Sequence, residues 1–158
     1  MRMYLIAVIA GAFLASAAHA SPVYVMRHLE RDAGKDPGLN AVGAKHAEEL
    51  PAWFRRDRPT AIFVTSFRRA QETVAPLAKR LRIDPITYDP AKPELMIAQV
   101  KASKGPVLIV GHSNTVPKIV EVLGGSSAPD LADTDYGRIW IIRGSKVRVA
   151  ELSMPQPR

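Results

Sequence analysis

The stretch "VYVMRHLERD" (residues 23–32) joins four apolar residues directly to an arginine, a histidine and a mixed cluster of charges. The apolar part, with its two valines, is typical of a buried β-strand. Charged residues that directly follow such a strand lie at the edge of a sheet, where open α/β proteins bind their ligands. Arg27 and His28 are therefore the first candidates for a functional site.

Similar apolar runs recur along the chain and alternate with helical patterns. The predicted strands span residues 22–27, 61–65, 85–88, 106–111, 138–142 and 146–152. The predicted helices span residues 40–56, 67–82, 91–103 and 115–123. This alternation predicts a three-layer α/β sandwich, in which a mostly parallel central sheet carries helices on both faces. The short turn "RGSK" predicts a C-terminal antiparallel hairpin.

The first twenty residues, "MRMYLIAVIAGAFLASAAHA", combine an early positive charge, an apolar run and small residues up to Ala20. A membrane-spanning helix needs roughly 20 apolar residues, so the pattern favours a secretory signal peptide over residues 1–20. Cleavage after Ala20 is favoured, and retention as an anchor is the alternative. Residues 21–158 are then expected to form one periplasmic or secreted domain, with no stable membrane insertion after signal removal.

The composition limits the kinds of partner that the protein can have. The chain has no cysteine, so its stability must come from packing rather than from disulfides. Its formal net charge of +7 fits an anionic partner. The basic residues are scattered, however, and no aromatic residues interleave with them as a platform for stacked bases requires. A phosphorylated substrate is therefore favoured, and nucleic acid is not expected as a partner.

Three of the predicted strands end on polar residues. The first strand ends in Arg27 and is followed by His28, the second ends in Thr65 with Arg69 shortly after it, and the fourth is followed by His112. The carboxyl ends of parallel strands meet at one edge of a sheet, so these side chains are expected to lie together. Guanidinium groups bind phosphate through paired, charge-assisted hydrogen bonds, and helix N-termini add further donors. The sequence thus predicts a pocket for a phosphoryl group.

Two histidines in such a pocket point to covalent catalysis. A neutral imidazole can attack phosphorus and form a phosphohistidine, which divides a difficult hydrolysis into two easier steps. The second imidazole can stabilise the charge on the equatorial oxygens. This chemistry requires neither a metal nor another cofactor, and none is expected here.

The polar residues belong to four motifs that resemble those of the histidine phosphatase superfamily, also called the phosphoglycerate mutase-like fold. In chain order these are Arg27-His28-Leu29-Glu30, "LNAVG" (39–43), "TSFRRAQET" (65–73) and Gly111-His112. They are similar to the family's Arg-His-Gly-Glu, Leu-Thr-x-x-Gly, Ser-x-x-x-Arg-Ala-x-x-Thr and Gly-His motifs. In the second motif Asn40 takes the place of the threonine and is expected to cap a helix equally well. The resemblance extends over essentially all of residues 21–158. Leu29 and Thr65 depart from it, since the family has a small residue and a serine there.

The resemblance implies a role for each matched residue. His28 is the implied nucleophile, and the implied catalytic residues are His28, His112, Arg27 and Arg69. The residues expected to bind substrate are Arg27, Arg69, His112, Thr65 and Glu30. For the proton donor to the leaving group, Glu94 is the first candidate, with Asp89, Glu30 and Asp32 as alternatives. Glu30 fits equally well a role in orienting an arginine.

The expected function is that of an exported, metal-independent phosphomonoester hydrolase that works through phospho-His28. The expected connections are short and leave the pocket open, which suits a small ester, a phosphoprotein or an envelope glycolipid. The alternative is a catalytically inactive exported protein that binds phosphate or another anionic ligand on the same fold. Outside the site, His46 is expected to be exposed, Trp53 and Trp140 to be buried, and Gly124-Gly125 to end a helix.

Overall fold

The computed structural model describes residues 21–126 and 128–152, and the predicted signal peptide lies outside them. In this part of the chain, six strands form one sheet in the order β3-β2-β4-β1-β5-β6. These are β1 (Val23–Arg27), β2 (Ala61–Thr65), β3 (Ile86–Tyr88), β4 (Val107–Gly111), β5 (Arg138–Arg143) and β6 (Lys146–Glu151). The first four strands are parallel, whereas β5 runs antiparallel to both β1 and β6. The predicted mostly parallel sheet and its C-terminal hairpin are confirmed.

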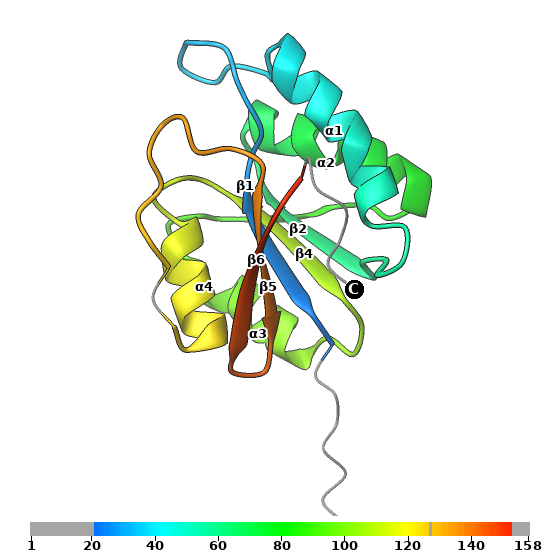
Figure 1. Cartoon of the computed structure of the whole chain (residues 1–158), viewed down its shortest axis with the longest axis vertical. Helices are drawn as coiled ribbons and strands as arrows, with labels where there is room; N and C mark the ends of the chain where they lie inside the picture. Colours follow the sequence, from blue (N-terminus) through cyan, green and yellow to red (C-terminus); the bar gives the residue numbers. More distant parts are fainter. Residues whose placement is uncertain (1–20, 127, 153–158) are drawn as a thin grey trace, which may run out of the picture.

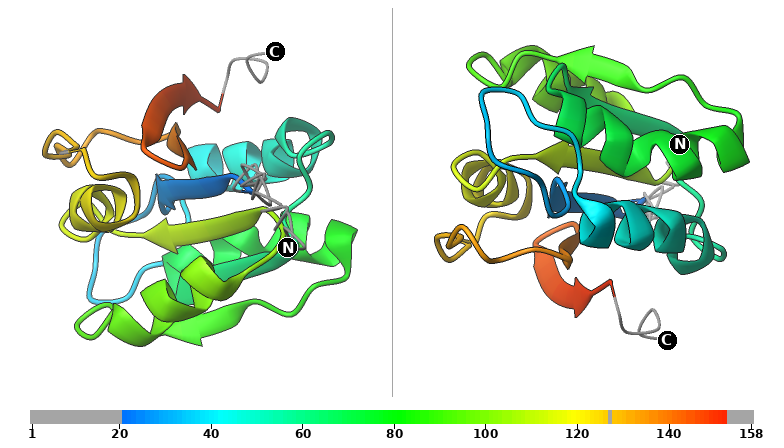
Figure 2. Two further views of the ribbon diagram at one scale, coloured as in Figure 1. Left: turned by 90° about the horizontal axis from the view of Figure 1, so that it is seen from below. Right: turned by 90° about the horizontal axis from the view of Figure 1, so that it is seen from above.

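Four helices in the described part cover the sheet and complete the predicted three layers. They are α1 (Ala41–Trp53), α2 (Arg68–Leu81), α3 (Glu94–Ala102) and α4 (Val116–Gly124). Helices α1 and α2 lie on one face, and α3 and α4 lie on the other (Figures 1 and 2). Tyr24 and Met26 of β1 pack toward the first pair, and Val25 packs toward the second. Burial of both faces explains why the strands are continuously apolar.

The predicted core tryptophans are both buried, Trp53 at 7% and Trp140 at 2% exposure. Trp53 belongs to the core under α1 and α2, where Tyr24 meets its ring edge-on at a centroid distance of 5.8 Å. Trp140 belongs to the core under α3 and α4. Gly125, at φ 68°, ends α4 as predicted, because this left-handed backbone conformation favours glycine.

The "LNAVG" segment starts α1 and ties it to the chain after β1. The Asn40 side chain accepts a hydrogen bond from the Gly43 amide at 2.9 Å, so the predicted helix cap is confirmed. Gly43 lies against the backbone of Glu30, where a Cβ would collide with the Glu30 carbonyl oxygen. The glycine therefore allows α1 to approach the loop that follows the candidate nucleophile.

The neighbouring strands β2, β4 and β1 bring the polar residues to one edge. Arg27 is in register with Gly111, and the His28 amide donates a hydrogen bond to the Gly111 carbonyl at 2.9 Å. His28 and His112 consequently emerge side by side at the carboxyl ends of adjacent strands. The chain segment 29–39 lies beyond the same edge (Figure 1), and the segment before β5 reaches this edge at Ala132, Asp133 and Asp135, whose carbonyl oxygens accept hydrogen bonds from Arg27.

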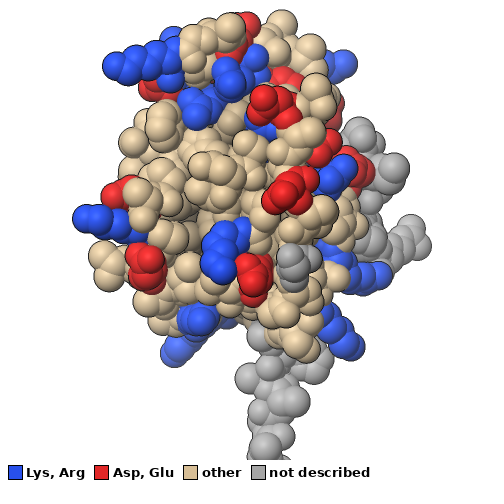
Figure 3. Space-filling model, turned by 90° about the vertical axis from the view of Figure 1, so that its left-hand side faces the viewer, with Lys and Arg blue, Asp and Glu red and all other residues tan. Residues whose placement is uncertain are grey.

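The surface carries charges of both signs. On the face shown in Figure 3, lysine and arginine side chains are interspersed with aspartate and glutamate side chains and form no continuous basic patch. None of the helices in residues 21–126 and 128–152 is both long and apolar enough to cross a membrane.

Candidate active site

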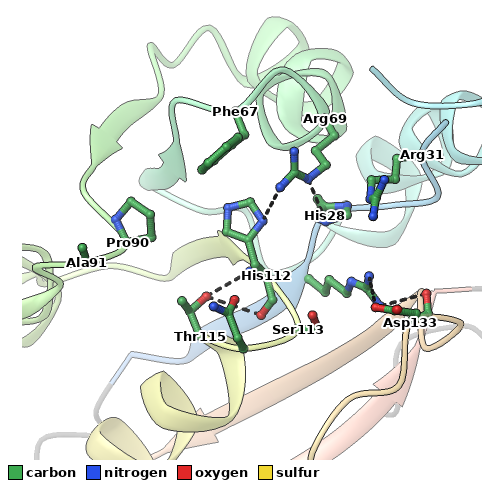
Figure 4. A pocket seen from close by; sticks show the side chains of 12 residues that line it. His28, Arg31, Phe67, Arg69, Pro90, Ala91, His112, Ser113, Thr115 and Asp133 are labelled. Carbon is green, nitrogen blue, oxygen red and sulfur yellow. Dashed lines mark hydrogen bonds and ion pairs between the residues drawn. The ribbon is translucent and has the colours of Figure 1, made fainter. Parts of the chain in front are cut away.

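A hollow of about 380 Å³ opens at the carboxyl edge of the sheet. Four of the five candidate residues at the strand ends contribute to its lining, namely Arg27, His28, Arg69 and His112. They come from β1, from the first turn of α2 and from the end of β4, and their side chains converge (Figure 4). The remaining lining residues are Arg31, Phe67, Pro90, Ala91, Ser113, Asn114, Thr115 and Asp133. The convergence of the two histidines and two arginines agrees with the sequence analysis.

His28 is held in the tautomer that a nucleophile needs. Its Nδ1 lies 2.8 Å from the Leu29 carbonyl oxygen, which only accepts, so the proton resides on Nδ1. Nε2 therefore carries a lone pair, and it accepts a hydrogen bond from Arg69 Nε at 3.1 Å. The imidazole is only 2% exposed and is fixed on both ring nitrogens. A phosphorus atom bound next to Arg69 would meet this lone pair.

His112 lies against the same arginine. Its Nδ1 is 3.4 Å from Arg69 Nη2, and its Nε2 is 2.9 Å from the Thr65 hydroxyl. Because an arginine can only donate, Nδ1 is the acceptor, and Nε2 donates to the Thr65 oxygen. Thr65 is fully buried and does not line the hollow. The structure therefore places Thr65 behind His112, where the hydroxyl orients the ring.

Arg27 binds a loop through one end of its guanidinium group and keeps a further N–H donor unpaired. Its Nη1 donates to the carbonyl oxygens of Ala132, Asp133 and Asp135 at 2.8 to 3.3 Å, and its guanidinium lies 4.2 Å from the centre of the Tyr136 ring. Its Nε is buried and finds no hydrogen-bond partner among the described residues. A buried unpaired donor is costly, and a bound phosphoryl oxygen would satisfy it.

Burial keeps both histidines neutral. It lowers the pKa of His28 to about 3. The hydrogen bond that Nδ1 donates to the Leu29 carbonyl acts in the opposite direction, and the nearby His112, Arg27 and Arg69 lower the pKa further. Burial and the two arginines lower the pKa of His112 to about 4. At neutral and mildly acidic pH the free enzyme therefore presents an unprotonated Nε2 at His28.

These pKa shifts make the stability of the protein depend on pH. An unfolded histidine has a pKa of about 6.5, so between that value and about 4 the unfolded chain binds protons that the folded site excludes. We expect each buried histidine to lower the free energy of unfolding by about 2 kcal/mol from pH 7 to pH 5. Urea denaturation at both pH values measures this loss, which should be smaller in His112→Asn. Equal losses in both proteins would contradict the assignment.

Thr73 connects the nucleophile to Arg69. Its hydroxyl oxygen accepts a hydrogen bond from the Leu29 amide at 3.0 Å and donates to the Arg69 carbonyl at 2.8 Å. Thr73 is fully buried, so no solvent replaces either bond. Sequence reasoning found Thr73 as the last residue of the "TSFRRAQET" motif but did not assign this task, because its partner Leu29 is 44 residues away.

We expect Thr73→Val to destabilise the protein by about 1 to 3 kcal/mol, because the Leu29 amide loses its buried acceptor. The rate of turnover should fall by roughly 10-fold to 100-fold, since His28 and Arg69 lose their common anchor. Thr73→Ser keeps the hydroxyl and should therefore retain most of the stability and most of the rate of turnover. Denaturant titration and steady-state kinetics measure the two effects. A Thr73→Val protein with unchanged turnover would show that the two side chains are positioned independently.

The four acids considered as proton donors lie outside the hollow. Glu94, at the start of α3, lines a neighbouring groove of about 550 Å³ between α3 and α4. Asp89 accepts a hydrogen bond from the Ala91 amide. Neither Glu30 nor Asp32 is among the residues that line the hollow. The role of Glu94 as the acid stays a prediction.

Glu30 is engaged with a histidine instead of with an arginine. Its carboxylate lies 2.9 Å from His46 Nδ1. The expectation that His46 is exposed is wrong: its side chain is 31% exposed, because α1 packs it against the loop after β1. His46 does remain outside the hollow, as expected.

Comparison with known proteins gives a family and several structural relatives. Residues 23–98 match the sequence profile of the histidine phosphatase superfamily (branch 1). No curated protein matched the sequence. SixA from Agrobacterium tumefaciens is 22% identical, with a TM-score of 0.62 over 84% of this chain and 97% of that one. The protein histidine phosphatase SixA complexed with tungstate is 18% identical, with a TM-score of 0.67 over 83% of this chain and 97% of that one.

A mycobacterial glucosyl-3-phosphoglycerate phosphatase with inorganic phosphate shares the fold as well, at 14% identity and a TM-score of 0.66 over 86% of this chain and 98% of that one. The matched segment contains the "RHLE" and "TSFRRAQET" motifs, which supply His28 and Arg69. His112 lies beyond that segment, and the sheet brings it into the same hollow. The chain is therefore similar to the histidine phosphatase superfamily, in its sequence over residues 23–98 and in its fold over most of its length.

Proposed function

We propose that the protein hydrolyses phosphate monoesters without a metal ion and through a covalent phosphohistidine on His28. The observation that carries this proposal is the pair of hydrogen bonds on the His28 ring. The Leu29 carbonyl oxygen accepts a hydrogen bond from Nδ1–H, and Arg69 Nε donates to the lone pair of Nε2. The nucleophile and a phosphate-binding group are thereby placed 3.1 Å apart before any substrate arrives.

In the first step, His28 Nε2 attacks phosphorus as the bond between phosphorus and the leaving oxygen breaks. Arg69 transfers its N–H donors from the imidazole nitrogens to the phosphoryl oxygens, and Arg27 Nε offers a further donor. The phosphate charge next to His112 favours the protonated form of that ring, which then donates to an equatorial oxygen. Two arginines and a histidine supply the positive charge that a metal ion supplies elsewhere.

In the second step, water attacks the phosphorus of phospho-His28. The bond between phosphorus and Nε2 breaks, inorganic phosphate leaves, and the neutral imidazole returns to its hydrogen bond with Arg69. Nδ1 keeps its proton and its hydrogen bond to the Leu29 carbonyl throughout. His28 therefore has the same tautomer at the start and at the end of each turnover.

The substrate is a phosphomonoester that enters an open pocket: a small ester, a phosphoprotein or an envelope glycolipid. The relatives described above carry names that refer to protein histidine phosphatase and to glucosyl-3-phosphoglycerate phosphatase. One of these names refers to a protein and the other to a small phosphorylated compound, and both kinds of substrate remain candidates for this chain. The export of the protein rests on the N-terminal pattern, and amino-terminal sequencing of protein recovered from the periplasm tests it. A mature chain beginning at Ser21 is expected, and an uncleaved cytoplasmic chain would contradict export.

Hydrolysis of an aryl phosphate by the purified protein, with a chelator present, tests the enzymatic proposal. Activity that is unaffected by the chelator and competitively inhibited by vanadate is the expected result. The alternative function is an anion-binding protein without turnover. It predicts vanadate binding with no hydrolysis of any phosphomonoester, and the neutral, oriented His28 speaks against it, because binding alone does not need a nucleophile.

A further inference from the structure

The described part of the loop between α4 and β5 (residues 125–126 and 128–137) brings one carboxylate to the hollow. Asp133 is the only acidic residue in the described ranges that lines it. Its side chain is 96% exposed and lies 3.9 Å from Arg27 Nη2. In Figure 4, Asp133 lies on the opposite side of the hollow from Pro90 and Ala91.

Asp133 is held in place by the same arginine that borders the phosphate position. Arg27 Nη1 donates to the carbonyl oxygens of Ala132, Asp133 and Asp135. The Ala132 amide donates to the Asp135 carboxylate at 3.0 Å, which closes a turn around Asp133. Tyr136 packs on the guanidinium and completes the attachment. The position of the Asp133 backbone is therefore tied to the phosphate pocket, although its side chain reaches solvent.

His28 attacks phosphorus from the inner side of the hollow, so a proton donor for the leaving group must lie on the outer side. The leaving oxygen lies roughly in line with the attacking atom and on the far side of phosphorus. His28 is buried at the base of the hollow, so the leaving group of a bound substrate points toward the mouth. Arg69 and His112 are occupied with the phosphoryl oxygens. Asp36 pairs with Arg69 at 3.5 Å but is not among the residues that line the hollow, whereas Asp133 is.

We propose that Asp133 is the catalytic residue that donates a proton to the leaving oxygen, and that the preferred substrates are alkyl phosphate monoesters. This inference rests on the proposed function. An alkoxide is a poor leaving group and gains most from a proton donor, whereas a nitrophenolate leaves without one. In this role the Asp133 carboxyl carries the proton when the ester P–O bond breaks and passes it to the leaving oxygen.

The proton balance closes over the two steps. As Nε2 of His28 bonds to phosphorus and the ester P–O bond breaks, the Asp133 carboxyl gives its proton to the departing oxygen and an alcohol leaves. The Asp133 carboxylate then accepts a proton from the water that attacks phospho-His28. Inorganic phosphate departs, and both Asp133 and His28 return to their starting states.

The test compares two substrates that differ in their leaving groups, nitrophenyl phosphate and a simple alkyl phosphate such as glycerol phosphate. Asp133→Asn should reduce kcat/KM for the alkyl ester by about 100-fold or more and leave nitrophenyl phosphate within about threefold. Asp130→Asn is the matched control, because Asp130 is an exposed residue of the same loop that does not line the hollow. It should leave both substrates unaffected.

Two outcomes would overturn the role of Asp133. An unchanged rate on the alkyl ester would mean that the proton comes from elsewhere. An equal loss on both substrates would mean that Asp133 acts only by positioning Arg27. In both cases the hydrolysis of nitrophenyl phosphate by the unsubstituted protein would still support the proposed function. A lack of hydrolysis of either substrate by the unsubstituted protein would contradict the proposed function, and the role of Asp133 with it.

Discussion

His28→Ala should reduce phosphatase activity by roughly 10⁴-fold or more while the protein stays folded. Removal of the imidazole removes the atom that forms the bond to phosphorus, and a loss of this size is usual for a covalent nucleophile. The side chain lines the hollow, and within the part of the chain that the structure describes it makes only two hydrogen bonds, to the Leu29 carbonyl and to Arg69. The free energy of unfolding should therefore change by less than about 2 kcal/mol. Aryl phosphate hydrolysis and urea denaturation measure the two quantities.

His46→Ala is the matched control for this prediction. His46 is a partly buried histidine bound to Glu30, and it does not line the hollow. Its loss should leave kcat within a few-fold of that of the unsubstituted protein. A His28→Ala protein that is folded and has normal activity would contradict the covalent mechanism. Equal losses in the two variants would mean that the fold, rather than the nucleophile, had been damaged.

Arg69→Ala should lower kcat/KM by about 10² to 10³-fold and weaken inhibition by vanadate. Arg69 donates to His28 Nε2 at 3.1 Å and lies 3.4 Å from His112 Nδ1, so it fixes both rings besides binding phosphate. The loss of one preorganised donor to a developing oxyanion typically has an effect of this size. Steady-state kinetics and a vanadate titration measure it.

Arg68→Ala tests whether this effect is specific. Arg68 adjoins Arg69 on α2, but its side chain is 67% exposed and pairs with Glu72 on the helix surface. It should keep full activity and vanadate affinity. Arg69→Lys is the second comparison, because a lysine keeps the charge but cannot form the planar pair of hydrogen bonds, and it should recover only part of the activity. Unchanged vanadate inhibition in Arg69→Ala would exclude Arg69 from the phosphate pocket.

Much of the fold could be predicted because its signals are local. The apolar runs, the cap at Asn40 and the stop at Gly125 are each read within a few residues, and the structure confirms them. The mostly parallel sheet is then predicted by the alternation of strand and helix patterns along the chain. Because the site lies where parallel strands end, the same reasoning brings His28 and His112 together although they are 84 positions apart in the chain.

The parts of the site that the sequence did not indicate depend on contacts between distant segments. Asp133 reaches the hollow because Arg27 holds its loop through carbonyl oxygens about 105 residues away, and carbonyl groups carry no sequence signal. The pairing of Glu30 with His46 likewise depends on how closely α1 approaches the loop after β1. A proton donor must lie within hydrogen-bond reach of the substrate, so it could not be identified from residue types alone.

The covalent intermediate itself gives the most direct test of the mechanism. The protein is mixed with an aryl phosphate, quenched in alkali during turnover, and digested for mass spectrometry under conditions that preserve phosphohistidine. The account predicts one phosphate on His28, formed within the time of a single turnover and absent from His28→Ala. Turnover with no phosphate on His28, or with phosphate on another residue, would contradict the central claim that His28 attacks phosphorus.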